Sequence, residues 1–396
     1  MAELQKEKLW TKDYIVAAIS GLFASMVFYI TVTTFAMYAV ATYQVNESIA
    51  GLVAGVFVVG SACGRLFSGR YTEQIGRRKV ILIGGVLFFV IGLAYLIPMP
   101  IVAFLVFRWL HGVSFGMYHN ALLTVATGLI PVSRRGEGLS YFSLNFVLAT
   151  ALGPFVGLYF IHHFSYPALF VACSVLALLA LVLGALVKIK PPVFTEEQLL
   201  HLKAKSTITD FFEKKALPIA VIIFIMSICY ASVTAFVDAY TIQMNLANFA
   251  SAFFIIYAIV ILIVRPFGGK LLDRKGDNIV MLPSIAFFAV SLLLLGFADN
   301  KVLLLVVSVC MALGYGNILT AGQAIAVNSS PHHRISTATS TYFIFNDLGQ
   351  GVGPLIMGMI AARQNFSAMY FVAAVIIALS LALYYVLHGR QARKGH

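Results

Sequence analysis

The chain has 396 residues, of which 61% are hydrophobic and only 11% are charged. A soluble domain of this size cannot bury that much apolar surface, so the composition excludes a soluble globular protein and predicts an integral membrane protein. The formal net charge of +12 would on its own suggest a nucleic-acid partner, so the position of the basic residues along the chain has to be considered.

Twelve apolar segments, each long enough to cross a bilayer, follow one another along the chain. The first begins at Tyr14 and is too long for the hydrophobic region of a signal peptide, so no cleavage is expected. The sequence therefore predicts an all-α membrane protein with twelve transmembrane helices. The predicted spans are 14–43, 48–68, 80–97, 101–130, 138–162, 165–187, 217–243, 248–269, 279–298, 301–328, 335–362 and 366–388.

The basic residues are concentrated on one side of these spans. All but three of the 27 Lys and Arg residues lie in or beside the two termini and alternate loops; the exceptions are Lys301, Arg363 and Arg108. By the positive-inside rule both termini are predicted to be cytoplasmic. The net charge is then a topology signal, and no nucleic-acid partner is expected. The four cysteines all fall within apolar runs, without the spacing of a metal site or a disulfide framework.

One long polar stretch, 188–216, divides the twelve spans into six and six. Its "TEEQLLHLKAK" segment is predicted to form a short amphipathic helix at the cytoplasmic surface. We therefore expect an N-terminal six-helix bundle over 1–187, a cytoplasmic linker over 188–216 and a C-terminal six-helix bundle over 217–396.

The two halves repeat at a constant offset of 200 residues, which indicates parallel repeats around a central cavity. The matching pairs are Arg65 and Arg265, Phe67 and Phe267, Gly69 and Gly269, Gly76 and Gly276, Val80 and Val280, Gly116 and Gly316, Arg134 and Arg334, Ser140 and Ser340, and Gly153-Pro154 and Gly353-Pro354, with Glu73 matching Asp273 in charge.

Three of these landmarks resemble motifs of the major facilitator superfamily. "GRYTEQIGRRK" (69–79) is similar to its loop signature G-x-x-x-D-R-x-G-R-R-K, "RWLHGVSFG" (108–116) to its fourth-span Arg motif, and "ALGPFVG" (151–157) to the fifth-span Gly-Pro motif of its proton-coupled exporters. The chain departs from the signature at Glu73 and Gln74, and its first span lacks the acidic residue of many multidrug members. The resemblance implies a twelve-span secondary transporter of the exporter type.

The polar segments after the second and eighth spans are interpreted as gating loops. Gly69 and Gly76 are expected to bracket a tight loop, in which glycine permits close helix approach and positive φ. Glu73 is then predicted to pair with Arg77 or Arg78, or to accept backbone N–H groups at a neighbouring helix N-terminus. Such contacts form only while the cytoplasmic side is closed. A plain topogenic charge cluster is the alternative. The second copy of the loop contains Gly269, Asp273 and Gly276.

The Gly-Pro motifs on the fifth and eleventh spans predict hinges. Small residues at i, i+4 spacing allow close packing, and a proline removes one helix hydrogen bond and permits bending. Ordinary helix packing is compatible with the same pattern. The predicted hinge residues are Gly153, Pro154, Gly157, Gly353 and Pro354.

Charged residues inside the spans are candidates for coupling or binding. Asp347 lies roughly 18 Å along its span, near the middle of a hydrocarbon core about 30 Å thick. An acid at that depth must face water, be paired or be protonated, so we predict a role in proton coupling or substrate binding, with a structural hydrogen bond as the alternative. Gln350 lies one turn further on. Arg108 is the only basic residue well inside a span, and the resemblance implies proton relay or anion contact for it; snorkelling is the alternative. His111 is a further candidate for proton coupling, and packing is its plainer interpretation.

Other polar and aromatic residues of the spans could line a cavity, and the sequence does not rank them. They include Tyr29, Thr34, Asn145, Tyr230, Tyr257, Asn317 and Gln323.

The sequence thus predicts a proton-coupled antiporter that exports a drug or metabolite by alternating access, and acts as a monomer in the plasma membrane. The expected partners are a small-molecule substrate, protons and the lipid bilayer. Neither an ATP-binding loop of the G-x-x-x-x-G-K-[ST] kind nor a soluble domain is found, so we expect no enzyme activity, no cofactor and no metal. Uptake of a nutrient, and a sensor or lipid-handling role, stay open as alternatives.

Overall fold

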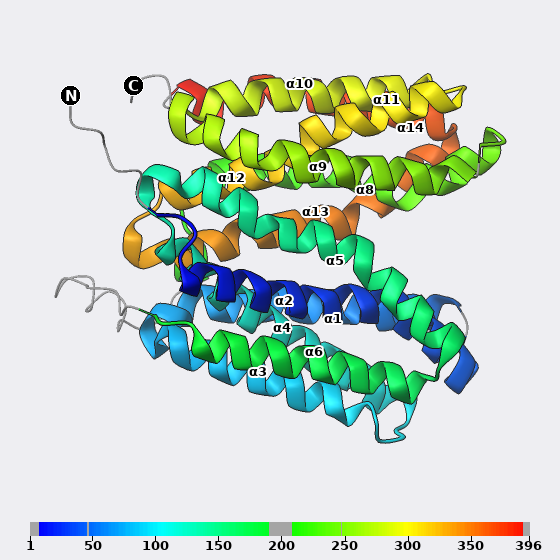
Figure 1. The fold of residues 1–396 in the computed structure, drawn as a ribbon. Helices are drawn as coiled ribbons and strands as arrows, with labels where there is room; N and C mark the ends of the chain where they lie inside the picture. The colour runs from blue at the N-terminus through cyan, green and yellow to red at the C-terminus, as the bar shows by residue number, and fades with distance from the viewer. Residues whose placement is uncertain (1–7, 46, 190–207, 247, 391–396) are drawn as a thin grey trace, which may run out of the picture. The chain divides into compact units, whose positions relative to one another are not determined.

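The computed structural model describes residues 8–45, 47–189, 208–246 and 248–390, and the regular elements within these ranges are helices (Figure 1). The first half contains α1 (Lys12–Tyr43), α2 (Glu47–Ile75), α3 (Arg77–Ala94), α4 (Ile101–Leu129), α5 (Arg135–His163) and α6 (Tyr166–Leu186). The second half contains α8 (Leu217–Gln243), α9 (Asn248–Lys275), α10 (Asp277–Gly296), α11 (Lys301–Met311), the π-helical turn η3 (Ala312–Gly316), α12 (Asn317–Asn328), α13 (Ile335–Arg363) and α14 (Phe366–Tyr384).

These helices coincide with the predicted segments, since α11, η3 and α12 together form the span predicted over 301–328. The all-α fold predicted from the sequence is therefore confirmed. The short amphipathic helix predicted after Thr195 lies outside the described residues. The described end of the linker carries a single short 3-10 turn, Ile208–Phe211.

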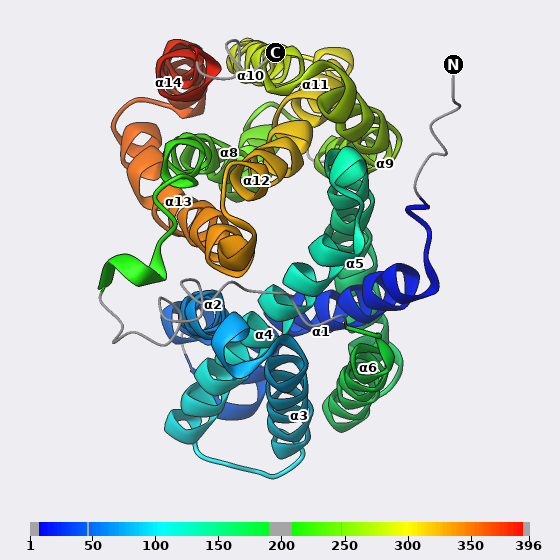
Figure 2. The ribbon, with the colours of Figure 1, turned by 90° about the vertical axis from the view of Figure 1, so that its left-hand side faces the viewer.

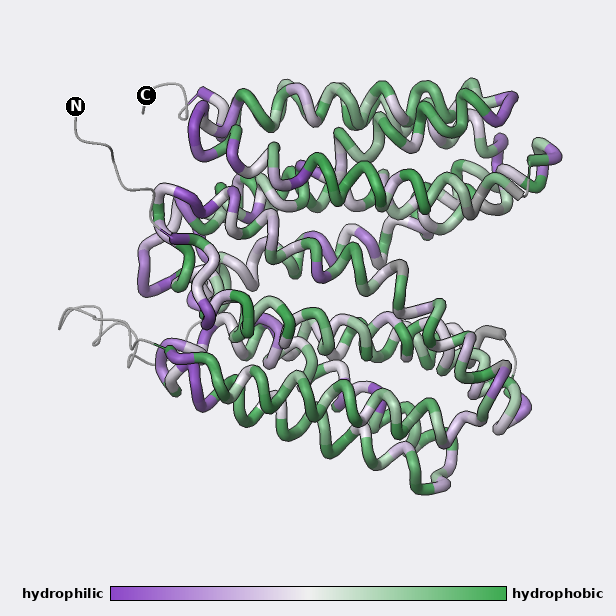
Figure 3. The backbone as a smooth tube through the Cα atoms, viewed as in Figure 1, coloured by the Kyte–Doolittle hydropathy of each residue, from purple (hydrophilic) through white to green (hydrophobic). Residues whose placement is uncertain are grey.

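Ten of the described helical segments are long and apolar enough to cross a membrane, judged by length and composition. α3 and α13 are not among them. α3 is short and begins with three consecutive basic residues, and α13 carries Asn346, Asp347 and Gln350 along its length. Figure 3 shows the helices apolar along most of their course, with hydrophilic residues gathered mainly near their ends. The chain is a multi-pass integral membrane protein.

The chain folds into two compact units that do not follow the midpoint of the sequence. The first consists of Met1–Val132, Asn145–Phe212 and Pro331–Ser340, and the second of Ser133–Leu144, Glu213–Ser330 and Thr341–His396. The start of α13 therefore packs with the first unit and the start of α5 with the second. In the first unit α6 lies against α1 and α3, while α4 lies against α2 and α3 (Figure 2).

The tightest helix packing of the first unit is between α2 and α4. A Cβ atom built on Gly60 or Gly64 would overlap the carbonyl oxygens of Trp109 and Val113, and one built on Gly112 would overlap that of Phe57. The two backbones are thus in direct contact, as small residues four apart allow. In the second unit, the residues 200 positions after Gly60 and Gly64 are Val260 and Val264. The counterpart of α4 in that unit contains the π-helical turn η3.

The predicted tight loops at 69–80 and 269–280 are shorter than expected. Residues 69–75 continue α2, because α2 ends at Ile75 and α3 begins at Arg77; the link is Gly76 alone, with φ of 105°. Gly276 likewise joins α9 to α10, with φ of 84°. The bracketing role expected of Gly69 and Gly269 is therefore wrong, because both lie inside helices. A positive φ at Gly76 and Gly276 is confirmed.

Gly76→Ala tests whether the reversal between α2 and α3 needs glycine. No atom lies within 4 Å of a Cβ placed there, so the substitution changes only the backbone preference, at a cost of about 1–3 kcal/mol for a strained φ. The thermal unfolding temperature of the detergent-solubilised protein should fall. Gly55→Ala is the matched control, because its Cβ also meets open space but lies in mid-helix, where alanine should stabilise by about 1 kcal/mol. Equal unfolding temperatures for the two variants would contradict the assignment.

Candidate functional site

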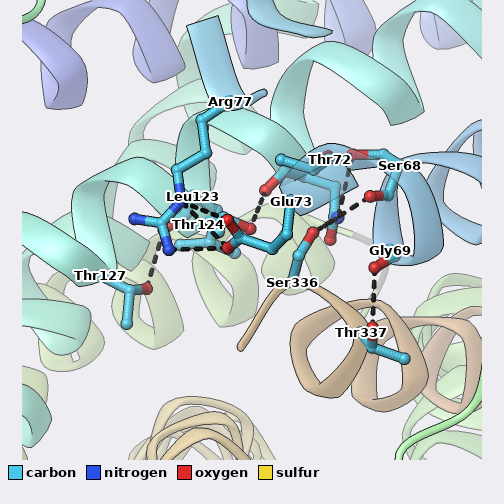
Figure 4. Close-up of polar contacts among 11 residues, drawn as sticks. Ser68, Gly69, Thr72, Glu73, Arg77, Leu123, Thr124, Thr127, Ser336 and Thr337 are labelled. Atoms are coloured by element: carbon cyan, nitrogen blue, oxygen red, sulfur yellow. Dashed lines mark hydrogen bonds and ion pairs between the residues drawn. The ribbon is translucent and has the colours of Figure 1, made fainter. Parts of the chain in front are cut away.

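The start of α13 is held against α2 by side-chain hydroxyl groups (Figure 4). Ser336 Oγ donates to the carbonyl oxygen of Ser68 at 3.1 Å, and Thr337 Oγ1 to that of Gly69 at 2.8 Å. Ser340 Oγ donates to the carbonyl oxygen of Arg65 at 2.7 Å. The three hydroxyls lie on one face of α13 and donate to carbonyl oxygens of α2 that lie within about one helical turn, those of Arg65, Ser68 and Gly69. We call Ser336, Thr337 and Ser340 the hydroxyl clasp.

Two further features bring α2 and α13 into direct contact at the hydroxyl clasp. A Cβ atom built on Gly69 would overlap the Cβ atom of Ser340, so only glycine permits this separation of the helices. Asn120 of α4 donates from Nδ2 to Ser68 Oγ at 3.2 Å and to Ser336 Oγ at 3.3 Å. The clasp therefore joins a helix of the first repeat to a helix of the second, with α4 behind it.

Glu73 lies beside this contact and pairs with Arg77, one of the two partners predicted for it. Arg77 Nε donates to both carboxylate oxygens at 3.0 Å, and Nη2 donates to Oε1 at 2.7 Å. The side chains of Glu73 and Arg77 are 3% and 6% exposed, so the pair is buried. It bridges the end of α2 and the start of α3 across Gly76. Arg78 is exposed, and its Nη2 lies 3.5 Å from the carbonyl oxygen of Ala185.

The second unit contains the counterpart contact, between α9 and the start of α5. Asp273 accepts the backbone N–H groups of Gly136 at 2.7 Å and Glu137 at 2.8 Å, in the first turn of α5. An acid at a helix N-terminus is stabilised by the unpaired N–H groups and by the helix dipole. Gly269 lies so close to α5 that a Cβ atom on it would overlap the carbonyl oxygen of Gly136. The second predicted arrangement, an acid at a neighbouring helix N-terminus, is thus found at Asp273.

Arg265 adds a second connection between α9 and α5. Its Nε donates to the carbonyl oxygen of Gly316 at 3.0 Å, and its Nη1 donates to the carbonyl oxygen of Ser143 at 3.0 Å and to Ser143 Oγ at 3.2 Å. Glu137 pairs with Arg134 at 2.8 Å and lies 3.5 Å from Lys270. The charged groups at this end of the second unit therefore form a connected set.

Asp347 lies half-buried on α13 beside a group of polar side chains in the second unit. Its Oδ1 accepts from Nδ2 of Asn346 at 3.2 Å. Oδ1 of Asn346 in turn accepts from Ser227 Oγ at 2.9 Å and Tyr315 Oη at 3.1 Å. These two hydroxyls are also 3.1 Å apart. Side chains of α8, η3 and α13 thus meet next to the acid.

Tyrosine rings extend from this group across the second unit. The ring of Tyr230 stacks on that of Tyr315, with centroids 3.9 Å apart and planes inclined by 10°. The ring centroid of Tyr257 lies 6.0 Å from that of Tyr230, with the planes inclined by 28°. Tyr230 and Tyr257 are half-buried, and Gln350 is exposed one turn beyond Asp347. Of the residues predicted from the sequence, the structure therefore brings Asp347, Tyr230 and Tyr257 together.

Arg108 and His111 lie in the first unit and are fully enclosed. Arg108 is 0% exposed, its Nε donates to the carbonyl oxygen of Val53 at 3.0 Å, and its guanidinium lies between the rings of Phe35 and Phe57. Its two Nη atoms have no hydrogen-bond partner in the described part of the chain. His111 stacks on Phe88 and lies 3.3 Å from Tyr95 Oη through Nδ1. The snorkelling alternative for Arg108 is excluded by this burial.

The predicted hinge glycines lie at close helix contacts. A Cβ atom on Gly153 would lie 2.6 Å from the Cβ atom of Tyr29, and one on Gly157 would lie 2.7 Å from Thr34 Cγ2. One on Gly353 would lie 2.6 Å from the Cβ atom of Ala231. Pro154 and Pro354 both lie within continuous helices.

The remaining predicted cavity residues are mostly engaged with backbone. Asn145 Nδ2 donates to the carbonyl oxygen of Ala18 at 2.7 Å, and Thr34 Oγ1 donates to that of Ile30 at 2.8 Å. Asn317 Nδ2 donates to the carbonyl oxygen of Leu313 at 3.0 Å, and Gln323 is buried. Asn145 thus joins α5 to α1, whereas Thr34 and Asn317 bond to carbonyls one turn back in their own spans.

Sequence reasoning missed three components of the site: the hydroxyl clasp, Glu137 and the pair Ser227 and Tyr315. Ser and Thr are common in membrane helices, so their presence alone does not signal an interhelical contact. Glu137 could have been found as the only acid in its predicted cytoplasmic loop. Tyr315 carried no signal, because a π-helical turn is not evident from residue spacing.

The sequence matches the family model described as Major Facilitator Superfamily over residues 17–283 and 247–395. The multidrug resistance protein MdtG of Escherichia fergusonii is 24% identical over 386 residues, covering 94% of this chain and 93% of the relative. The human organic anion transporter MFSD10 is similar in structure, with a TM-score of 0.73 at 14% identity over 94% of this chain and 98% of that one. The proton:xylose symporter XylE has a TM-score of 0.74 at 14% identity, covering 94% of each chain. The structural likenesses show a shared fold.

Arg77→Gln tests the buried pair at Glu73. Removing the guanidinium leaves a buried carboxylate without its cation, which costs about 3–5 kcal/mol, so the unfolding temperature in detergent should fall sharply. The double variant Glu73→Gln with Arg77→Gln should recover much of the loss, since no charge is then stranded. Arg78→Gln is the control at the adjacent, exposed position and should change stability by less than about 0.5 kcal/mol. Equal effects of Arg77→Gln and Arg78→Gln would show that the pair contributes nothing.

Proposed function

The chain belongs to the Major Facilitator Superfamily, and on that premise we propose that it is a proton-coupled antiporter that exports a small molecule. Members of this family are transporters that bind small-molecule substrates. Export is favoured by similarity to MdtG, a multidrug resistance protein, over nearly the full length of both chains. The fifth-span "ALGPFVG" motif supports the same direction. The proposed location is the plasma membrane, and the proposed working unit is a monomer of two six-helix bundles, 1–187 and 217–396, joined by 188–216.

The observation that carries the proposal is the position of Asp347. Its carboxylate lies about midway along α13, where an ionised acid costs about 2.5–3.5 kcal/mol unless it is compensated. It is half-buried and is bonded to Asn346. The register partner of Asp347 in the other repeat is Val147, so the acid is not part of the scaffold that the two halves share. An acid retained at such cost is suited to binding and releasing a proton.

The hydroxyl clasp and the Asp273 contact are proposed to be the gate. Both lie at helix ends that the positive-inside rule assigns to the cytoplasm, and both join helices of different repeats. Opening this side requires α13 to leave α2 and α5 to leave α9, which breaks the hydrogen bonds of Ser336, Thr337, Ser340 and Asp273. Gly153-Pro154 and Gly353-Pro354 are the proposed points at which α5 and α13 bend.

A membrane potential is sufficient to drive this exchange. Moving one elementary charge through 100 mV releases about 2.3 kcal/mol, which sustains a substrate gradient of about 50-fold. One titrating acid per cycle therefore accounts for export without nucleotide hydrolysis. Arg108 is proposed to hold negative charge in the first unit, since its two Nη atoms are buried without partners in the described residues.

Transport in inside-out vesicles with a preset pH gradient tests the coupling. A panel containing ethidium, benzoate and glucose represents cationic, anionic and neutral compounds, and a pH-sensitive dye reports dissipation of the gradient. We expect one compound class to dissipate the gradient in the wild-type protein, and Asp347→Asn to abolish that response. Asp299→Asn makes the same chemical change at an exposed residue between α10 and α11 and should leave it intact.

Two outcomes would contradict this function. A pH-gradient response that survives in Asp347→Asn would remove the acid from the coupling. Gradient-driven accumulation in right-side-out vesicles, with none in inside-out vesicles, would replace export by uptake.

A further inference from the structure

We propose that Asn346, oriented by Tyr315 and Ser227, is the positioning residue that senses the protonation of Asp347 and passes it to α8 and to the π-helical turn. The inference depends on the proposed role of Asp347 as the coupling acid. It concerns a different group, an amide whose orientation is determined by three neighbours.

The hydrogen bonds around Asn346 allow one orientation of its amide while Asp347 is ionised. A carboxylate can only accept, so it requires the amide Nδ2 group, which lies 3.2 Å from Asp347 Oδ1. The amide oxygen is then directed to the other side, where it accepts from Ser227 Oγ and Tyr315 Oη at 2.9 and 3.1 Å. If the amide were turned over, its Oδ1 atom would face a carboxylate oxygen of Asp347, and two acceptors would meet without a proton between them.

Protonation of Asp347 removes this restriction. The neutral carboxyl gains an O–H donor, so either end of the amide can face it. If the amide turns, its Nδ2 group faces Ser227 and Tyr315, whose hydroxyls must then rotate to accept. Since Ser227 belongs to α8 and Tyr315 to η3, one proton on α13 permits a change in the hydrogen bonds of two other segments.

The π-helical turn is what brings Tyr315 to this place. A π-helical turn adds one residue to the helical turn and shifts the residues that follow, and such turns are frequent at functional sites. The ring of Tyr315 is buried and contacts the rings of Tyr230 and Phe288, so its hydroxyl has little freedom to leave Asn346. Ser227 is also fully buried.

Comparison of the repeats argues against a purely structural role for the network. At the offset of 200 residues, Ser227, Tyr315 and Asn346 correspond to Val27, Phe115 and Phe146. At these three positions the first repeat therefore has none of these polar groups. Among the residues that the structure describes, the network thus lies in the half that carries the acid.

Other ionisable groups near the network are tyrosines and an arginine. Tyr230 of α8 stacks on Tyr315, Tyr257 of α9 lies beyond Tyr230, and Tyr342 of α13 is buried nearby. Arg265 of α9 is a nearby cation, since its Nε donates to the carbonyl oxygen of Gly316, the residue after Tyr315. It is held by Gly316 and Ser143, so its charge is present in both protonation states of Asp347.

Infrared titration of the full-length protein in lipid, without any substrate, tests the inference. The carboxylic C=O band of protonated Asp347 is identified as the band missing from Asp347→Asn, and its intensity is followed against pH. Asn346→Leu removes the donor to the carboxylate, so the midpoint should rise by about one pH unit, or about 1.4 kcal/mol. Tyr315→Phe keeps the ring stack but frees the amide, and should raise the midpoint by about half as much.

Tyr342→Phe is the matched control. Tyr342 is a fully buried tyrosine of the same unit, and its hydroxyl donates to the carbonyl oxygens of Ile318 and Leu319, away from Asn346. Its loss should leave the midpoint unchanged. Ser227→Ala provides a second test that preserves the tyrosine ring, and should shift the midpoint in the same direction as Tyr315→Phe.

The outcomes separate the two proposals. If no carboxylic band titrates that is missing from Asp347→Asn, then Asp347 is not the coupling acid and the proposed function fails with this inference. If the band is present but its midpoint is the same in wild type, Asn346→Leu and Tyr315→Phe, the positioning role is overturned while Asp347 keeps its function. A shift in Tyr342→Phe as large as that in Tyr315→Phe would also overturn it.

Discussion

Helices in lipid gain little by packing their apolar side chains together, because hydrocarbon solvates those side chains as well as a neighbouring helix does. Close backbone approach and hydrogen bonds must therefore supply the contact, and this protein combines the two differently at different helix pairs. Gly60 and Gly64 bring α2 against the backbone of α4. Between α13 and α2 the hydroxyl clasp is added to a close approach at Gly69. When two helices separate, the packing at a glycine contact is lost and nothing in the same helix replaces it. A serine or threonine hydroxyl can instead donate to a carbonyl oxygen of its own helix. The clasp is accordingly the contact that costs less to break.

The two repeats share a scaffold but differ in the polar groups placed on it. Arg108 Nε donates to the carbonyl oxygen of Val53, and Ser308 Oγ donates to that of Phe253; both members of the second contact lie 200 residues after those of the first. The same helices are therefore joined at the same carbonyl by different donors. Exchanging serine for arginine places a charge among the aromatic rings of the first unit. In the second unit that position is the neutral Ser308, and an acid, Asp347, stands on α13 instead.

The sequence predicted the helices well because hydropathy over a span is a sum over about twenty residues and tolerates local exceptions. It also predicted two alternative arrangements for Glu73, a pair with Arg77 or Arg78 and a helix N-terminus, since an acid near helix ends has few ways to be satisfied; Glu73 has the first and its counterpart Asp273 the second. It failed at 69–80, where glycine and charge suggested a loop and the chain continues as helix to Ile75. It also failed at Tyr315, because a π-helical turn changes which face a residue occupies without altering the composition of the span.

A single inverted charge explains why Glu73 and Asp273 have different partners. Arg77 follows Glu73 by four residues and forms a salt bridge with it, whereas the residue four positions after Asp273 is Asp277. Two acids cannot pair, so Asp273 accepts N–H groups of α5, while Asp277 lies 2.8 Å from His388 of the same unit. The α9 contact with α5 therefore rests on a charged acceptor. The α2 contact with α13 rests on neutral hydroxyls, because its acid is already occupied. The two halves of the proposed gate thus differ in chemistry, and a change in local charge acts on the α5 side more directly than on the α13 side.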